Sequence, residues 1–300
     1  MKTPALCGGL LVAVFLTASR PVTPAVSFGF PDGVAIDAAG MLYVVDTDNG
    51  LVHKVDSAGE ATPFNTGTLA YPTGIAVSTT GTVYIADAGS HSIVQVSPTG
   101  EISTLAHNRE LIFPAAVAVD AAGNVYVADS GSEPGSGTVQ KISPQGARAT
   151  LAKGLNKPAG IAVSAQGLVY VADTGNNTVR QIDPDGHVTV LAANFNHPRG
   201  LAVEPTGALL VANTYGNNIR RVSPAGQVSL VAEGFNFPAG LAAGPAGIVY
   251  VTDTGTSSVR KIGTDGQVSL LAGGSSSPVP AALPLADSSA ISHADTTRHK

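Results

Sequence analysis

Apolar residues in this chain come in short runs of three to five, rich in Val, Ile and Tyr and separated by Gly, Pro, Asn and Asp. The stretch 158–191 shows the pattern most clearly, with apolar runs at 161–163, 168–172, 179–182 and 188–191. Runs of this length between turn-forming residues predict strands, because helices need longer periodic segments. The stretch is therefore predicted to be an antiparallel meander of four strands.

The same unit occurs six times. Each unit has a proline followed fifteen residues later by Asp or Asn, and the pairs are Pro31 and Asp46, Pro72 and Asp87, Pro114 and Asp129, Pro158 and Asp173, Pro198 and Asn213, and Pro238 and Asp253. A single meander cannot bury both of its faces, so the six sheets are expected to pack face to face around a common axis. We predict an all-β fold, a six-bladed β-propeller of four-stranded antiparallel blades, over residues 26–272.

Loop lengths single out one end of this ring. The spacing from the proline to the next turn glycine is nine residues in all six units, whereas the third unit carries a four-residue insertion within Ser130–Gly137. Lengths change only after the second and the fourth strand, and these loops open at the same end of a meander. We call this end the loop face. Variable loops on a rigid scaffold usually carry binding, so the loop face is predicted to bind a ligand; the alternative is that its loops merely tolerate change.

Residues 1–25 are predicted to be a signal peptide. Lys2 precedes an apolar run over 5–16, and small residues follow up to Ala25, the predicted cleavage site, with Ser19 as the alternative. The run is shorter than the roughly 20 residues of a membrane span. We expect a secreted or extracytoplasmic protein of a bacterial cell envelope with no stable span after signal removal; the alternative is a tether through the uncleaved segment.

Charge and composition limit the classes of partner that the protein is expected to bind. Between residues 31 and 272 there are 12 Lys+Arg and 19 Asp+Glu, which argues against nucleic acid because that partner requires phosphate neutralisation. Cys7, the single cysteine, lies in the predicted signal, so the mature protein is expected to have no thiol chemistry. Residues 273–300 are rich in Ser, Pro and Ala and are predicted to form a disordered tail. We expect a monomer.

The segment Gly167–Ile182, with the sequence GLVYVADTGNNTVRQI, is echoed at 123–129, 207–219 and 247–262. It resembles the NHL repeat, and the repeated region looks most like the extracytoplasmic sensor domain of actinobacterial receptor Ser/Thr kinases, a six-bladed NHL propeller. No kinase domain is present, since the sequence has neither an HRD nor a DFG motif. The resemblance implies a sensor-like binding or scaffold module without enzymatic activity.

Two further resemblances keep an enzyme open as the alternative function. Streptogramin B lyases are similar propellers, usually of seven blades, with a catalytic His and Glu and a magnesium ion, and peptidyl-hydroxyglycine (amidating) lyases hold zinc through histidines. This chain has no Trp, and so lacks the WFTE-like strands of the first family. The histidines of its repeats fall at different repeat positions, so we predict no metal and no cofactor; they are His53, His91, His107, His187 and His197. A propeller lyase or hydrolase is the alternative.

Two repeated rows have structural interpretations. The row of Asp and Asn residues is predicted to accept hydrogen bonds from backbone N–H groups two or three residues on, which would cap the following turn. The third strands carry basic residues, predicted to pair with acids of neighbouring blades or to face water, with a polyanion-binding stripe as the alternative. They are Lys54, Lys141, Arg180, Arg220, Arg221, Arg260 and Lys261.

The residues beside the repeated proline are the candidate ligand site, because their loops should surround the mouth of the central channel. Around the ring, blades 6, 1, 2 and 3 offer aromatic residues, while blades 4 and 5 offer Lys157, His197 and Arg199. An aromatic arc beside a basic arc suits a ligand with a hydrophobic or sugar face and an acidic group. We predict a protein, peptide or glycan ligand and no catalytic residue. The alternative is that the aromatic rings are fixed under their own loops and the basic groups are solvated. The candidates are Phe30, Asp32, Tyr71, Phe113, Lys157, His197, Arg199 and Phe237.

Overall fold

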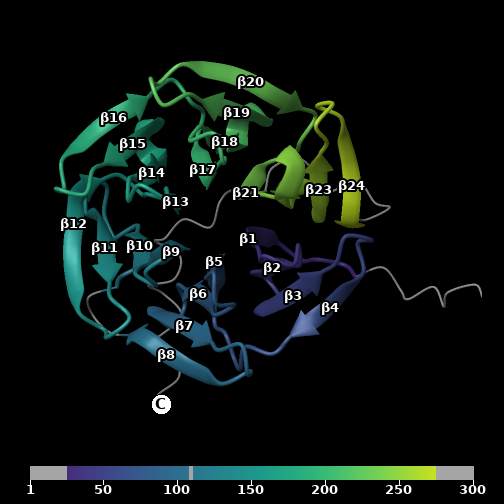
Figure 1. Ribbon diagram of the computed structural model, residues 1–300, viewed down its shortest axis with the longest axis horizontal. Coiled ribbons are helices and arrows are strands. Elements are labelled where there is room, and N and C mark those ends of the chain that lie inside the picture. The colour runs from purple at the N-terminus through teal and green to yellow at the C-terminus, as the bar shows by residue number, and fades with distance from the viewer. Residues whose placement is uncertain (1–25, 108–110, 275–300) are drawn as a thin grey trace, which may run out of the picture.

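The computed structural model describes residues 26–107 and 111–274. Within them, six sheets of four antiparallel strands stand around a central axis (Figure 1), so the predicted six-bladed propeller is confirmed. The first strand of each sheet lies innermost and the fourth lies at the rim. The predicted signal peptide and the tail from residue 275 lie outside the described residues.

Strands follow chain order within every blade. From the inner to the outer strand, blades 1 to 6 are β1 (Pro31–Ile36), β2 (Leu42–Asp46), β3 (Leu51–Val55) and β4 (Ala61–Phe64); β5 (Pro72–Val77), β6 (Val83–Asp87), β7 (Ser92–Val96) and β8 (Ile102–His107); β9 (Pro114–Val119), β10 (Val125–Asp129), β11 (Gly137–Ile142) and β12 (Arg148–Leu155); β13 (Gly160–Val163), β14 (Val169–Asp173), β15 (Thr178–Ile182) and β16 (Val188–Ala192); β17 (Pro198–Val203), β18 (Leu209–Asn213), β19 (Asn218–Val222) and β20 (Val228–Glu233); β21 (Pro238–Ala243), β22 (Val249–Asp253), β23 (Ser258–Ile262) and β24 (Val268–Gly273).

The hydrophobic core lies between blades. Every residue of the second strands is buried, so both faces of these strands meet protein. Between blades 2 and 3, for example, Tyr84 and Ile93 belong to the same apolar cluster as Val117, Val125 and Ile142. Equivalent clusters occupy the other five seams. Since burial of apolar area is the main stabilising term, each blade depends on both of its neighbours.

The inner strands approach one another closely at the axis. A Cβ atom on Gly160 would collide with the backbone oxygen of Arg199, and one on Gly240 would collide with that of Asp32. Glycine therefore occupies this position in five units, because it lets neighbouring backbones come together. The third unit has Ala116 instead.

The Asp and Asn row has a structural role, but its partners differ from the prediction. Asp129 accepts hydrogen bonds from the backbone N–H groups of Ile112 (2.9 Å) and Phe113 (2.7 Å), and only its bond from Gly131 follows the predicted spacing. The other members likewise accept from residues 16 or 17 positions earlier. The prediction of a local cap was wrong because the antiparallel pairing places the start of the first strand beside the end of the second.

A hydroxyl group after each of these residues joins one blade to the next. Thr174 donates from Oγ1 to the backbone oxygen of Pro198 at 2.7 Å, and four other seams have the same bond from Thr or Ser to the repeated proline. Blade 2 has Ala88 at this position, and there Thr73 Oγ1 donates to the backbone oxygen of Pro114 at 3.0 Å. We call these six bonds the seam bonds. They were not foreseen in the sequence.

Blades 6 and 1 close the ring without exchanging a strand. Thr252 and Thr254 donate to the backbone oxygens of Asp32 (2.5 Å) and Pro31 (2.7 Å), and Phe28 lies in the apolar cluster of this seam. Closure thus combines packing with hydrogen bonds. Residues 26–28 form no strand.

The acids that pair with the basic row lie in the same blade, contrary to the prediction of neighbouring blades, and Arg260 Nη1 also donates to the backbone oxygen of Gly234 at the end of blade 5. Arg180 Nε donates to Asp173 at 2.6 Å and Arg260 Nη1 donates to Asp253 at 3.2 Å. In both cases the arginine lies on the third strand and the aspartate at the end of the second strand of the same blade. The Lys54 ammonium lies over the rings of Tyr43 and Phe64. Side chains on one strand reach the adjacent strand of the same sheet more directly than the next sheet, which explains the difference.

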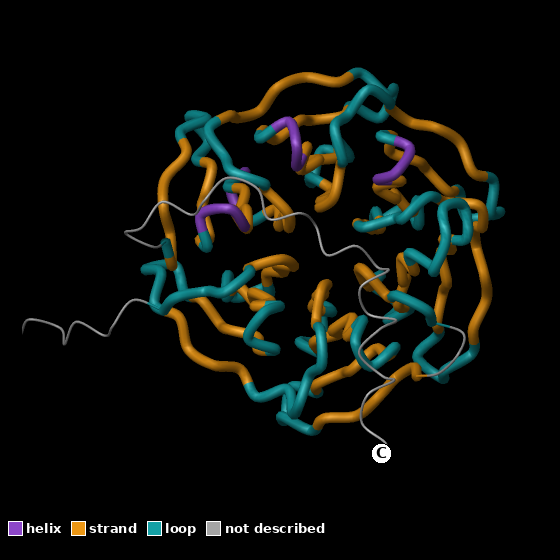
Figure 2. The backbone as a smooth tube through the Cα atoms, turned by 180° about the vertical axis from the view of Figure 1, so that it is seen from behind, coloured by secondary structure: helices purple, strands orange, loops and turns teal. Residues whose placement is uncertain are grey.

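The loop face is where the sequence placed it. Ser130 N–H donates to the backbone oxygen of Phe113 at 2.9 Å, so the insertion in the third unit lies beside a loop that precedes a first strand. Helices in the described ranges are four turns of three residues each (purple in Figure 2), and none could span a bilayer.

Candidate functional site at the channel mouth

A cavity of about 60 Å³ lies on the axis, lined by the starts of all six inner strands. Its walls are mostly Gly, Ala and branched apolar residues, and its charged side chains are Asp32 and Arg199. Pockets for organic ligands are several times larger, about 300 Å³ or more, so the cavity can take water or one small group. A larger ligand would have to sit outside it, on the loop face.

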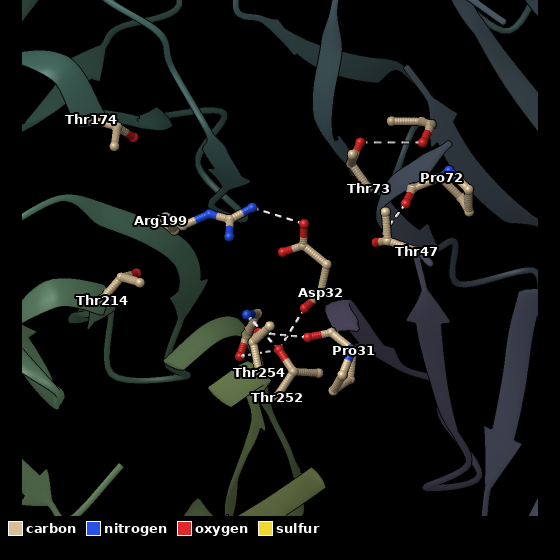
Figure 3. Close-up of polar contacts among 12 residues, drawn as sticks. Pro31, Asp32, Thr47, Pro72, Thr73, Thr174, Arg199, Thr214, Thr252 and Thr254 are labelled. Atoms are coloured by element: carbon tan, nitrogen blue, oxygen red, sulfur yellow. Dashed lines mark hydrogen bonds and ion pairs between the residues drawn. The ribbon is translucent and has the colours of Figure 1, made fainter. Parts of the chain in front are cut away.

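Asp32 and Arg199 form an ion pair across this cavity. Arg199 Nη2 donates to Asp32 Oδ2 at 2.8 Å, between blades 5 and 1 (Figure 3). Burial raises the pKa of Asp32, and the Arg199 guanidinium offsets this only in part. The pair therefore lies in a weakly solvated place where each charge depends on the other.

Tyr71 and Phe113 lie on one side of the mouth, at blades 2 and 3. Their rings are tilted, with centroids 6.4 Å apart. Burial raises the pKa of the Tyr71 phenol, with smaller contributions from the charges of Asp32, Arg199 and Asp48. Tyr71 is therefore near enough to the ion pair to respond to it electrostatically.

A second aromatic group lies over blades 5 and 6. The rings of His197 and Tyr215 are stacked with centroids 4.2 Å apart, and Tyr215 meets Phe237 edge to face at 5.6 Å. Burial lowers the pKa of His197, so this imidazole is neutral at pH 7. With His197 neutral and Arg199 paired to Asp32, the predicted basic arc carries less charge than the sequence indicates.

The backbone holds these side chains in fixed positions. Lys157, His197 and Phe237 have φ angles of 49°, 52° and 54°, a left-handed conformation that residues other than glycine adopt at a cost. The backbone N–H groups of His197 and Phe237 donate to the side-chain oxygens of Asn177 (2.9 Å) and Asn217 (3.0 Å) in the preceding blade. The aromatic group is therefore set by the scaffold before any ligand arrives.

The structure thus brings Asp32, Arg199 and Tyr71 together and places Phe113 beside Tyr71. It also gathers His197 and Phe237 around Tyr215, which the sequence analysis did not select. Tyr215 stands where the matching loops of blades 4 and 6 have glycine, and this departure from the repeat was the available signal. The two remaining candidates lie at equivalent positions before the proline: Phe30 is partly buried and Lys157 is exposed.

Residues 74–231 match the model of the SMP-30/gluconolactonase/LRE-like region, and residues 235–262 match the NHL repeat. The first match covers more than half of the chain. This chain belongs to the SMP-30/gluconolactonase/LRE-like family. The NHL-repeat resemblance is also confirmed, whereas the likeness to kinase sensor domains stays a prediction.

Solved structures similar to this SMP-30/gluconolactonase/LRE-like propeller include enzymes and an assembly protein. A gluconolactonase from Xanthomonas campestris superimposes with a TM-score of 0.69 at 18% identity, over 82% of this chain and 88% of that one. Virginiamycin B lyase from Staphylococcus aureus superimposes with a TM-score of 0.61 at 17% identity, over 81% of this chain and 84% of that one. A chain of a nidogen/laminin complex superimposes with a TM-score of 0.68 at 22% identity, over 76% of this chain and 91% of that one. No curated protein matches the sequence. At these identities the likeness shows the fold alone.

The axial residues of this family member do not form a metal site of the kind that the lyases suggest. Asp32 is the single carboxylate lining the cavity, it is paired with Arg199, and no histidine lines the wall. A catalytic metal centre usually needs three protein ligands. In the described ranges, the one group of three close potential ligands is Asp183, Asp185 and His187, in the turn between β15 and β16, where Asp183 Oδ1 accepts from two backbone N–H groups. This turn lies at the end opposite to the loop face.

Proposed function

We propose that this protein is an exported, monomeric binding or scaffold propeller, without enzymatic activity, whose loop face recognises a protein, peptide or glycan of the cell envelope. The observation that carries the proposal is the pair of aromatic groups around the channel mouth, Tyr71 with Phe113 and His197 with Tyr215 and Phe237. Aromatic rings held on a rigid scaffold provide large contact area at little cost in conformational entropy.

The cavity supports binding over chemistry. It is too small for an organic substrate, and its two charged groups already bind each other. A ligand seated on the rings would therefore contact the loop face broadly and reach the axis only with a small group.

Capture from cell-envelope extract tests the proposal. The intact protein should retain a ligand that a Phe113→Ala, Lys157→Ala, Phe237→Ala variant releases. The matched control, Asp183→Ala, Asp185→Ala, His187→Ala, changes an exposed turn at the opposite end and should retain the ligand. Circular dichroism must show that both variants are folded. Equal retention by the two variants would exclude the loop face.

A hydrolase or lyase is the second candidate, favoured by the family match over residues 74–231 and by the gluconolactonase and lyase folds. It requires a carboxylate, a histidine and a divalent ion to meet near the axis. Elemental analysis of the purified protein, together with an assay of lactone hydrolysis with and without added Mg²⁺ or Zn²⁺, separates the two functions. Stoichiometric metal with metal-dependent turnover would establish the second one.

A further inference from the structure

The Arg199 guanidinium has more donors than its surroundings have acceptors. It carries five N–H groups, and Nη2 alone has an acceptor among the residues that the structure describes, namely Asp32. Figure 3 shows this single bond, with the rest of the guanidinium facing the axial space. The Arg199 side chain is 17% exposed and none of its nitrogens is both buried and unpaired, so its other donors face solvent in the channel. Guanidinium donors without a protein acceptor favour an acceptor oxygen of a ligand, because charge-assisted hydrogen bonds are stronger than neutral ones.

The cavity has space for such an acceptor, and its walls supply few of their own. The lining is built from the residues that follow the repeated proline at the starts of the inner strands, and its one hydroxyl side chain, Thr73, already donates to the backbone oxygen of Pro114. A volume of about 60 Å³ admits a carboxylate group but no ring. A group that enters must therefore be small and rich in acceptors, with its body left outside among the aromatic side chains.

Charge along the chain is uneven in a way that permits an acidic ligand. Residues 31–110, which form blades 1 and 2, contain nine Asp+Glu and two Lys+Arg. Residues 111–272 contain ten of each, so the net negative charge of the repeats comes from the first two blades. Arg199 and Lys157 belong to blades 5 and 4. An anion that approaches over blades 4 and 5 meets fewer acidic side chains than one that approaches over blades 1 and 2.

We propose that the axial cavity receives a carboxylate of the ligand, which binds the free donors of Arg199 beside Asp32, while an apolar or aromatic body rests on the rings of the mouth. The inference rests on the proposed function and specifies its ligand as an organic acid or a peptide with an accessible carboxylate. Arg199 suits this role because it makes a single hydrogen bond to Asp32. That bond orients the guanidinium and leaves its other N–H groups free for the carboxylate of a ligand.

The test compares 3-phenylpropionate with its neutral amide, 3-phenylpropionamide, by calorimetry. We expect the acid to bind about tenfold more tightly than the amide, in line with the roughly double strength of charge-assisted hydrogen bonds. Asp32→Asn should tighten binding of the acid and leave the amide unchanged, since it removes a neighbouring negative charge and keeps the shape of the side chain. Arg199→Gln should abolish the preference. Arg221→Gln is the matched control, because Arg221 pairs with Glu204 on the exposed part of β19.

Two peptides distinguish the sources of the carboxylate. A peptide ending in Gly-Phe with a free terminus should bind if peptides are the natural ligands, and its amidated form should not; binding of 3-phenylpropionate alone would assign the site to small organic acids.

The outcomes separate this inference from the proposed function. Equal binding of acid and amide, lost for both in Phe237→Ala, would overturn the carboxylate proposal and leave the loop face as the site. Weaker binding of the acid by Asp32→Asn would show that the Asp32 charge does not repel the acid at this site and would also overturn the proposal. So would failure of the acid to bind at millimolar concentration. If Arg199→Gln does not fold, the sign of the Asp32→Asn effect decides alone.

Discussion

The seams between blades and the mouth of the channel use the six repeats in opposite ways. At the seams, equivalent residues do equivalent work: a buried Asp or Asn fixes the start of the first strand, and a hydroxyl group joins the repeated proline of the next blade. At the mouth, the residues beside that proline differ from blade to blade, and they include aromatic, basic and acidic side chains. Where the repeats agree they hold the ring together, and where they differ they are free to meet a ligand.

Blade 2 shows that the seam requires a bond rather than a particular residue. Ala88 cannot donate, and Thr73, which belongs to the mouth position of its unit, supplies the bond instead. This exchange means that a residue at the mouth has to be tested for a structural role before a ligand role is assigned to it.

The largest loss of stability is expected from a substitution at a seam between blades. Asp129→Ala removes a buried acceptor of three backbone N–H bonds and should lower the free energy of unfolding by about 4–5 kcal/mol, the lower end of the range for three hydrogen bonds to a charged group at about 1.5–3 kcal/mol each. Urea denaturation measures the change. Asp129→Asn is the control and should lose less than half as much, because Asn213 serves at the equivalent position of blade 5. Equal losses would contradict the role of acceptor.

The contributions of Asp32, in the cavity, and Asp46, at a seam, to protein stability should depend on pH with opposite sign. The pKa of Asp32 is raised from 3.8 by burial, so its contribution to stability is present at low pH and is lost as pH rises through its folded pKa. Wild type should therefore lose stability relative to Asp32→Asn as pH rises from about 4.

For Asp46, burial alone would raise the pKa, but the His53 imidazole 3.7 Å away and hydrogen bonds from the Phe30 and Gly29 backbone and the Asn49 side chain lower it overall. Wild type should lose stability relative to Asp46→Asn as pH falls below about 4. Thermal unfolding of the three proteins from pH 3 to 8 measures both slopes. Slopes of the same sign would remove the distinction between the seam and the cavity.

A double-mutant cycle tests whether Thr73 takes the place of a hydroxyl at position 88 in blade 2. Thr73→Val should cost about 1 kcal/mol, the usual net contribution of one hydrogen bond. Ala88→Ser restores the donor present at the other seams and should reduce that cost, giving a coupling energy of about 1 kcal/mol or less by denaturation. Additive changes would mean that Ala88 and Thr73 do not serve the same carbonyl.

The smallest effect on stability is expected at the mouth. Tyr215→Gly restores the residue found in blades 4 and 6 and should change the free energy of unfolding by less than about 1 kcal/mol, because Tyr215 is only partly buried and glycine suits this loop. Retention of the envelope ligand should nevertheless fall at least several-fold. A large loss of stability with unchanged retention would reverse the assignment of this residue.

The sequence predicted the architecture well because the fold depends on a property repeated six times. The run lengths place the strands of blade 4 within about one residue of their observed ends, and the loop lengths, which vary only after the second and fourth strands, identify the loop face. Pairing in space was predicted less well. The partners of Asp129 lie 16 and 17 residues earlier and the partner of Arg199 lies on a blade that is not its neighbour, and neither distance is encoded in a local pattern.

Hydrogen exchange of the protein with and without the ligand fraction captured from envelope extract tests the central claim most directly. The account predicts slower exchange in the loops that contain Tyr71, Phe113, His197, Tyr215 and Phe237, and no change in the outer strands β16, β20 and β24. Those strands expose Val190, Leu230 and Leu270, the main apolar surface outside the mouth among the described residues. Protection confined to the outer strands would contradict the account.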